Sequence, residues 1–190
     1  GVQTCALPIL TKGRIRQKPD FRDSEWLLTN KIWEAETWKD ANGNIRKKGV
    51  IAAGTRRFSK SELEASFCAW KACNWKNSQV LVSGLNEPDI KIITDKIDLG
   101  INELPDYWIK TKVEDNWKKQ VSLGFKDKAT GERNIYSSFA IRNFDGGANE
   151  EALAGLTPSG GVIDEGGKGS FLKALIAGLP GLSTPNGWRG

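Results

Sequence analysis

The sequence predicts an α/β protein in which a mostly parallel β-sheet is flanked by helices. Three apolar runs of strand length, at 50–53, 79–84 and 160–165, alternate with helical patterns, as expected of parallel strands joined by crossover helices. The chain has 190 residues, 38% of them hydrophobic and 27% charged, which is the composition of one globular domain with a substantial core.

Composition narrows the possible classes of protein. No apolar run approaches the 18 residues of a membrane span, so we expect no membrane partner. The absence of histidine argues against a zinc site and excludes histidine acid–base catalysis. Cysteines at positions 5, 68 and 73 give no disulfide framework, so we expect a reducing, intracellular setting. The net charge of +5 is compatible with a nucleic-acid partner but does not require one.

The first nine residues, Gly-Val-Gln-Thr-Cys-Ala-Leu-Pro-Ile, look like the conceptual translation of a sequencing adapter, and the chain contains no methionine. We therefore expect residues 1–9 to be an adapter artefact and the true protein to start before or near Leu10. Residues 10–22 are basic and show no periodicity, so we expect a loop or arm there.

The first expected helix runs from Ser24, as its N-cap, to about Thr37. Its pattern is carried by Trp26, Leu27, Asn30 and Trp33. A turn at 40–44 follows, and the basic residues 46–48 are interpreted as solvated surface leading into the first strand.

Residues 49–71 have the layout of a phosphate-binding P-loop. A short apolar run, Val50–Ala53, predicts a buried strand, and residues 54–59 form a glycine-led loop. Lys60 and Ser61 then open a helix whose apolar face carries Leu63, Phe67 and Trp70. Main-chain N–H groups at such a helix start converge on phosphate oxygens. We expect Lys60 to meet the β- and γ-phosphates and the Ser61 hydroxyl to bind Mg²⁺.

The loop departs from the usual G-x-x-x-x-G-K-[ST] pattern at one position. Gly54 is in place, but Ser59 stands where the second glycine belongs, and its Cβ makes a positive φ costly. The expected phosphate-binding residues are Gly54, Thr55, Arg56, Arg57, Phe58, Ser59, Lys60 and Ser61. A basic turn that merely begins a helix is the alternative interpretation.

The middle of the chain predicts a second strand–helix unit and then a hairpin. Residues 79–84 are expected to be a buried strand, and Glu87-Pro88 to open a helix with Ile90, Ile93, Ile97 and Ile101 on its buried face. Two alternating segments, 121–125 and 135–141, predict a β-hairpin or neighbouring strands. Residues 143–160 are expected to form a long loop.

Three aromatic residues, Tyr107, Trp108 and Trp117, stand among lysines between positions 102 and 118. They could stack on nucleic-acid bases. The interpretation we favour is an aromatic-rich surface helix whose rings pack on the protein.

The third strand, 160–165, ends in two acids, Asp164 and Glu165. Ligands of open α/β sheets bind at the carboxyl ends of the strands, so these acids are expected beside the P-loop, as in a Walker B element. We expect Asp164 to hold Mg²⁺ through water or the Ser61 hydroxyl. Glu165 is expected to polarise the water that attacks the γ-phosphate. A strand that ends in a solvated acidic turn is the alternative.

These motifs together resemble the ATPase domain of the large terminase subunit of tailed bacteriophages. The resemblance spans residues 20 to 190 and rests on segments 50–61, 153–158 and 162–168, including the small-residue step Ala154-Gly155 before the third strand. It implies an ASCE-type P-loop NTPase fold, with ATP and Mg²⁺ as cofactors. In that family an arginine four residues before the lysine senses or stabilises the γ-phosphate, a role that the resemblance assigns to Arg56.

The resemblance also implies a biological setting. It implies ATP hydrolysis that drives DNA into procapsids in the host cytoplasm. The implied partners are double-stranded DNA, the portal protein, the small terminase subunit and further copies of the chain in a ring on the portal. We expect residues 10–190 to be a partial ATPase domain, with the coupling motif and the nuclease domain beyond Gly190. No nuclease activity is therefore expected of the chain itself.

Two other functions stay open at this stage. One is a helicase-like or other P-loop ATPase with the same Asp-Glu pair. The other is a nucleotide- or DNA-binding module without turnover, in which Ser59 marks a degenerate loop.

Overall fold

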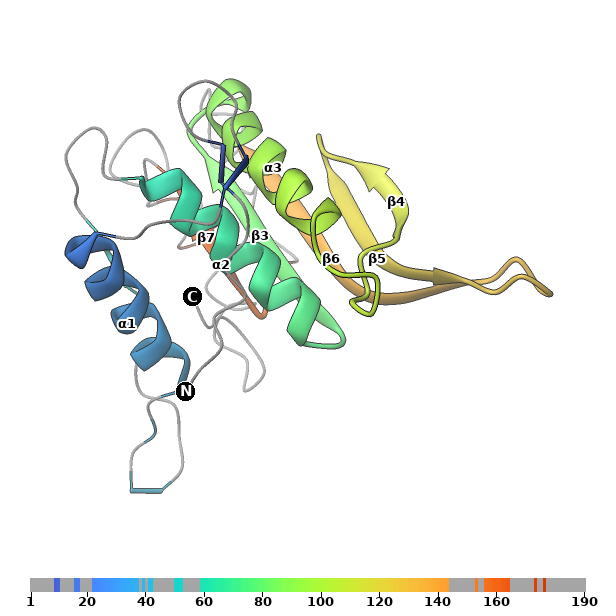
Figure 1. Cartoon of the computed structure of the whole chain (residues 1–190), viewed down its shortest axis with the longest axis horizontal. Helices are drawn as coiled ribbons and strands as arrows, with labels where there is room; N and C mark the ends of the chain where they lie inside the picture. The colour runs from blue at the N-terminus through green and yellow to red at the C-terminus, as the bar shows by residue number, and fades with distance from the viewer. Residues whose placement is uncertain are drawn as a thin grey trace.

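The computed structural model shows a sheet covered by helices (Figure 1). It describes residues 9–10, 16–17, 22–37, 39, 41–42, 50–52, 59–143, 153, 156–164, 173 and 176. Of the segment expected to be an adapter artefact, only Ile9 is described, so that expectation lies outside the described residues.

The main sheet has five strands in the order β4-β5-β6-β3-β7. Strand β3 is parallel to both β6 and β7, whereas β4, β5 and β6 are joined antiparallel. The α/β class is therefore confirmed, with its parallel part on the β6-β3-β7 side. The strands are β3 (Ser78–Gly84), β4 (Lys112–Asn116), β5 (Gln120–Lys126), β6 (Arg133–Asn143) and β7 (Gly160–Ile163). A separate pair consists of β1 (Ile9–Leu10) and β2 (Arg16–Gln17).

Two helices, α2 (Lys60–Asn74) and α3 (Glu87–Asn102), lie side by side over the sheet and pack on β3 (Figure 1). As predicted, Leu63 and Phe67 of α2 are buried. The four isoleucines that define the apolar face of α3 are also buried: Ile90, Ile93, Ile97 and Ile101. Val80 and Val82 of β3 lie in the core shared with α2 and α3, and Leu81, on the opposite face of the strand, is also fully buried.

The start of α3 follows the sequence closely. Asn86 is its N-cap and accepts a hydrogen bond from the N–H of Asp89 at 3.0 Å, and a proline lies in the first turn.

The start of α1 (Asp23–Thr37) differs from the prediction. Arg22, and not Ser24, precedes the first helical residue, and its carbonyl accepts from the N–H groups of Glu25 and Trp26. Glu25, three residues on, accepts the N–H of Arg22 at 2.8 Å. This is half of a capping box, and it fixes the helix start without a serine cap.

Two sequence predictions about elements are wrong. Residues 50–52 are not a strand, and Val50 and Ile51 are exposed. An apolar run forms a strand only where a neighbouring strand pairs with it, and this segment is not part of the five-stranded sheet. Residues 103–118 are not a helix but turns followed by β4. The indoles of Trp108 and Trp117 pack against the core, as favoured, whereas Tyr107 is 82% exposed.

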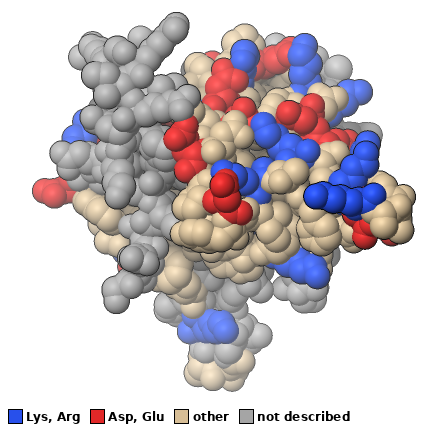
Figure 2. Space-filling model, turned by 45° about the vertical axis from the view of Figure 1, so that its right-hand side comes forward, with Lys and Arg blue, Asp and Glu red and all other residues tan. Residues whose placement is uncertain are grey.

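The predicted hairpin is confirmed as β5–β6. Its register pairs Val121 with Phe139, and both side chains are fully buried. The turn end of the hairpin projects away from the helices (Figure 1). On the face shown in Figure 2, basic and acidic side chains of the described residues are interspersed, and neither charge forms one continuous field.

One glycine makes possible the close pairing of β7 with β3. Gly161 has a φ of 157°, and a Cβ added there would overlap the main chain of Leu81. The register then places Val162 opposite Val82 and Ile163 opposite Ser83. The residue that follows, Asp164, donates its N–H to the carbonyl of Ser83 at 2.8 Å. The end of β7 is thereby fixed beside the end of β3.

Candidate functional site: the start of α2 and the end of β7

The site is centred on the first residue of α2. Lys60 begins the helix directly after Ser59, which has the left-handed φ of 56° and ψ of 27°. This is the conformation that glycine would adopt at no cost, so the serine reproduces the backbone path that the phosphate-loop pattern assigns to its second glycine. The main-chain carbonyl of Ser59 accepts from the N–H groups of Glu62 and Leu63, which starts the helix.

The side chain of Ser59 makes no capping hydrogen bond to the first turn of α2. A serine at an N-cap would ordinarily accept from one of the first N–H groups. The N–H groups of a helix start carry a partial positive charge and are suited to an anion. The start of α2 therefore combines a lysine and helical N–H groups that Ser59 does not cap.

Asp164 is brought to Lys60 from the other side of the site. It follows β7, retains 8% exposure, and its carboxylate forms an ion pair with the Nζ of Lys60. Two residues far apart in the sequence, one at a helix start and one at a strand end, thus meet as the two predicted motifs require. The C-terminal end of a parallel strand is where open α/β sheets hold their ligands.

A third ionisable group, Glu64, interacts electrostatically with this pair. Glu64, one helical turn after Lys60, has a carboxylate oxygen that is buried and has no hydrogen-bond partner among the described residues. Burial is the main cause that raises the pKa of Glu64 to about 7, and the negative charge of Asp164 raises it further. The cations Lys60 and Lys96 act in the opposite direction. Lys96 of α3 itself pairs with Glu62 at 2.5 Å.

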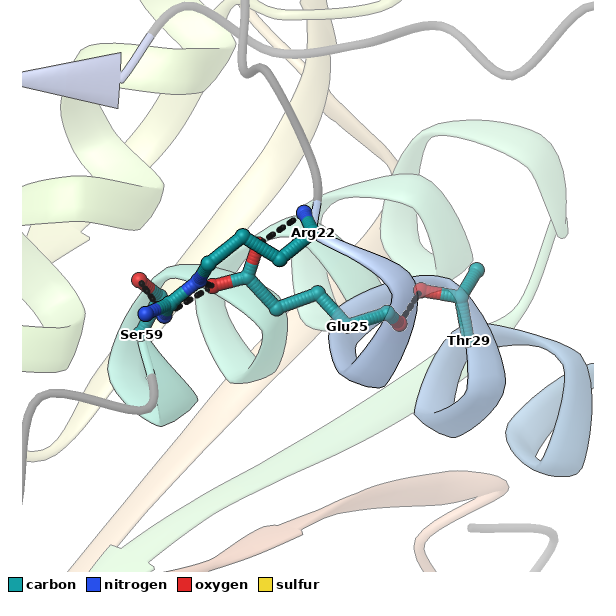
Figure 3. A network of polar contacts seen from close by, with 4 residues as sticks. All are labelled: Arg22, Glu25, Thr29 and Ser59. Atoms are coloured by element: carbon teal, nitrogen blue, oxygen red, sulfur yellow. Dashed lines mark hydrogen bonds and ion pairs between the residues drawn. The ribbon is translucent and has the colours of Figure 1, made fainter. Parts of the chain in front are cut away.

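An ion pair from α1 closes the site at Ser59 (Figure 3). The guanidinium of Arg22 donates to Glu25 at 2.6 Å and to the Ser59 hydroxyl at 3.3 Å. Burial alone would raise the pKa of Glu25, but hydrogen bonds from Arg22 and Ser59 outweigh it and the pKa is lowered. Glu25 is only 3% exposed, so it is held as a buried carboxylate.

The structure describes four of the ten predicted site residues: Ser59, Lys60, Ser61 and Asp164. It brings Lys60 and Asp164 into contact and places Ser59 and Ser61 on either side of Lys60. Gly54, Thr55, Arg56, Arg57, Phe58 and Glu165 lie outside the described residues.

The residues present fit Mg²⁺ together with a nucleotide. Mg²⁺ is usually held by one or two protein oxygens, with waters and substrate phosphates completing its shell. Ser61 and Asp164 supply a hydroxyl and a carboxylate. Among the described residues, no group of three or more histidines, cysteines, aspartates or glutamates is placed to hold a metal ion.

Sequence reasoning missed three residues of this site: Arg22, Glu25 and Glu64. A signal existed for each. Glu25 stands three residues after Arg22, the spacing of the acidic half of a capping box. Glu64 stands four residues after Lys60, and therefore on the same face of α2.

Comparison with known proteins supports the fold. No protein-family model matches the sequence, and no curated protein matches it. Among solved structures, the large terminase ATPase domain of Thermus phage P74-26 matches with a TM-score of 0.53 and 18% identity, over 70% of this chain and 54% of that one. An arginine-to-alanine variant of the same domain matches with a TM-score of 0.53 and 19% identity. The chain thus spans about half of the domain that it resembles.

None of the described helices is long and apolar enough to cross a membrane. The sheet order, the two helices that cover it and the match to the phage domain agree with one another. The chain therefore has the fold of a bacteriophage large terminase ATPase domain.

Proposed function

We propose that this chain binds ATP with Mg²⁺ and hydrolyses it, as part of the motor of a phage large terminase. The observation that carries the proposal is the ion pair between Lys60 at the start of α2 and Asp164 at the end of β7. A lysine at a helix start and an acid at a strand end are the two groups that a nucleotide-hydrolysing site has to bring together. The likeness of the fold to a terminase ATPase domain supports the same function.

The roles of the residues follow from their charges and positions. Lys60 neutralises phosphate oxygens, and the N–H groups at the start of α2 donate hydrogen bonds to the same phosphates. Ser61 and Asp164 hold Mg²⁺, which when bound neutralises charge on the β- and γ-phosphates. Before nucleotide arrives, the Lys60–Asp164 pair satisfies both charges at a position where neither is fully solvated. Binding exchanges that pair for contacts of each partner with the ligand.

Two further roles rest on the sequence motif and the resemblance. Glu165 directly follows Asp164 and serves as the base that orients the attacking water. Arg56 stabilises the γ-phosphate. Hydrolysis then drives translocation of double-stranded DNA, with the portal protein, the small terminase subunit and further copies of the chain as partners in the host cytoplasm.

A nucleotide titration tests the proposal. A fluorescent ATP analogue is titrated into the chain with Mg²⁺ and again with EDTA, and then into Lys60→Ala. We expect Mg²⁺-dependent binding that is lost in the variant, while its circular dichroism spectrum stays unchanged. Lys91→Ala is the matched control, because Lys91 forms an exposed ion pair with Asp95 on α3, away from the site. Equal affinity in wild type and Lys60→Ala would contradict the proposal.

A phosphate-release assay separates hydrolysis from binding. Mg²⁺-dependent release that Lys60→Ala abolishes supports an ATPase. If ATP binds tightly but no phosphate is released, even by the full-length protein on its portal, the chain is instead a nucleotide-binding module. Full-length protein is needed because motors of this kind complete their sites with a neighbouring subunit, and an arginine supplied in this way contributes about 10³–10⁵ in rate.

A further inference from the structure

Ser59 has a backbone conformation that its residue type does not favour. Within the described residues only Ser59 and Asn77 combine a side chain with a positive φ. Asparagine tolerates the left-handed region, whereas serine has little intrinsic reason to adopt it, since its Cβ approaches the following carbonyl. The left-handed state of Ser59 therefore has to be maintained by its surroundings.

The Arg22–Glu25 pair is the contact that can maintain it. The Ser59 hydroxyl accepts from Nη2 of Arg22 at 3.3 Å, and Ser59 is among the groups that lower the pKa of Glu25. Hydrogen bonds fix Arg22 to Glu25. The Glu25 carboxylate accepts from the Arg22 guanidinium at 2.6 Å and from the Arg22 main-chain N–H at 2.8 Å. Figure 3 shows the Arg22 guanidinium joined to both the Glu25 carboxylate and the Ser59 hydroxyl at the start of α2, with Thr29 bonded to the Glu25 carbonyl one turn along α1.

This contact has a consequence for α2. Ser59 has a left-handed backbone and a hydroxyl bonded to Arg22, and its side chain does not cap its own helix. The Ser59 side chain therefore leaves the N–H groups of the first turn uncapped. A relaxation of Ser59 to negative φ would turn its side chain and redirect the chain that enters Lys60.

We propose that Arg22 and Glu25 are positioning residues, which hold Ser59 in the left-handed conformation and thereby aim the start of α2 at the nucleotide phosphates. This inference rests on the proposed function for its ligand and adds the device that sets the shape of the site. Neither residue needs to touch the nucleotide, since both act through Ser59.

The proposal predicts that glycine at position 59 makes the pair dispensable. Glycine populates the left-handed region about as readily as negative φ, so it needs no support from α1. Arg22→Ala should weaken binding of a fluorescent ATP analogue with Mg²⁺ about tenfold when residue 59 is serine. In the Ser59→Gly background the same substitution should change affinity less than about twofold.

Lys31→Ala is the matched control. Lys31 and Glu34 form an exposed ion pair of the same spacing farther along α1, with a distance of 3.0 Å. This variant should leave affinity unchanged in both backgrounds. Arg22→Lys keeps the positive charge but loses the planar guanidinium, so its ATP affinity should fall between those of wild type and Arg22→Ala. It replaces Arg22→Ala in the test if the alanine variant does not fold. Equal losses from Arg22→Ala in the serine and glycine backgrounds would overturn the proposal.

A second readout needs no nucleotide. Urea unfolding of wild type, both single variants and the double variant forms a double-mutant cycle between positions 22 and 59. We expect Arg22→Ala to lower the unfolding midpoint with serine at 59 and to lower it measurably less with glycine. Additive shifts would overturn the inference and leave the proposed function standing. Failure of wild type to bind nucleotide would overturn the proposed function, and the cycle would then decide the role of the pair at Ser59.

Discussion

Lys60 and Asp164 form an ion pair across the junction of α2 and β7, with the lysine side chain 34% exposed and the aspartate side chain 11% exposed. The aspartate is thus the more deeply buried partner and depends on the lysine for its charge to be tolerated. The contact that satisfies Asp164 also lies at the centre of the proposed nucleotide site.

Gly161→Ala tests how β7 delivers Asp164 to this position. A Cβ there would overlap the main chain of Leu81, so strands β3 and β7 would have to separate. We expect a loss of about 2–3 kcal/mol in the free energy of unfolding, measured by urea denaturation. Gly131→Ala is the control, because Gly131 also has a positive φ, of 73°, but open space around it. Its loss should be about 1 kcal/mol, and equal losses in the two variants would contradict the close approach.

Glu64 predicts a pH dependence of stability. Its pKa in the folded chain is about 7, above the ordinary 4.5, so the folded state keeps a proton that the unfolded state releases. Stability should therefore fall as pH rises from 4.5 to 7 and level off above that, by at most about 3 kcal/mol. Urea unfolding in EDTA, without nucleotide, measures the slope.

Glu64→Gln should flatten that slope, because the amide has no proton to release. Glu34→Gln is the control, since the Glu34 carboxylate forms an exposed ion pair with Lys31 on α1 at 3.0 Å. Its slope between pH 4.5 and 7 should match that of wild type. A slope that persists in Glu64→Gln would assign the effect to another group.

Glu165→Gln separates binding from catalysis. Adjacent residues at a strand end point in different directions, so Asp164 and Glu165 are expected to have different roles. The amide keeps the shape of the side chain and removes the base, so ATP should still bind while hydrolysis by the assembled full-length protein falls about 10²–10⁴-fold. Phosphate release under single-turnover conditions measures this, and a wild-type rate would remove Glu165 from the mechanism.

The sequence predicted well those elements whose buried face is set by the spacing of residues within the element itself. The isoleucine spacing of α3 and the alternation of β5 and β6 each define one buried face, and both were found as predicted. The segment 50–52 failed because its apolar character says nothing about whether a partner strand is present. The helix predicted around Tyr107 failed because aromatic rings pack equally well from turns and from strands.

The site was predictable in its parts and not in its assembly. Lys60 and Asp164 were identified from two separate motifs, and the sheet order then joined them. The contact of Arg22 and Glu25 with Ser59 could not be inferred, because nothing in the sequence indicates that the start of α1 lies against the start of α2. The left-handed state of Ser59 was expected to be costly, and the structure shows which side chains contact it.

The Mg²⁺ dependence of ATP binding to Asp164→Asn tests the central claim most directly. The affinity of a fluorescent ATP analogue is measured with Mg²⁺ and with EDTA, for wild type, Asp164→Asn and the control Asp95→Asn, which lies in an exposed ion pair on α3. If Lys60 and Asp164 form the nucleotide site, wild type and the control bind more tightly with Mg²⁺. Asp164→Asn then binds equally with and without the metal, at the level of wild type in EDTA. An unchanged Mg²⁺ effect in Asp164→Asn would contradict the account.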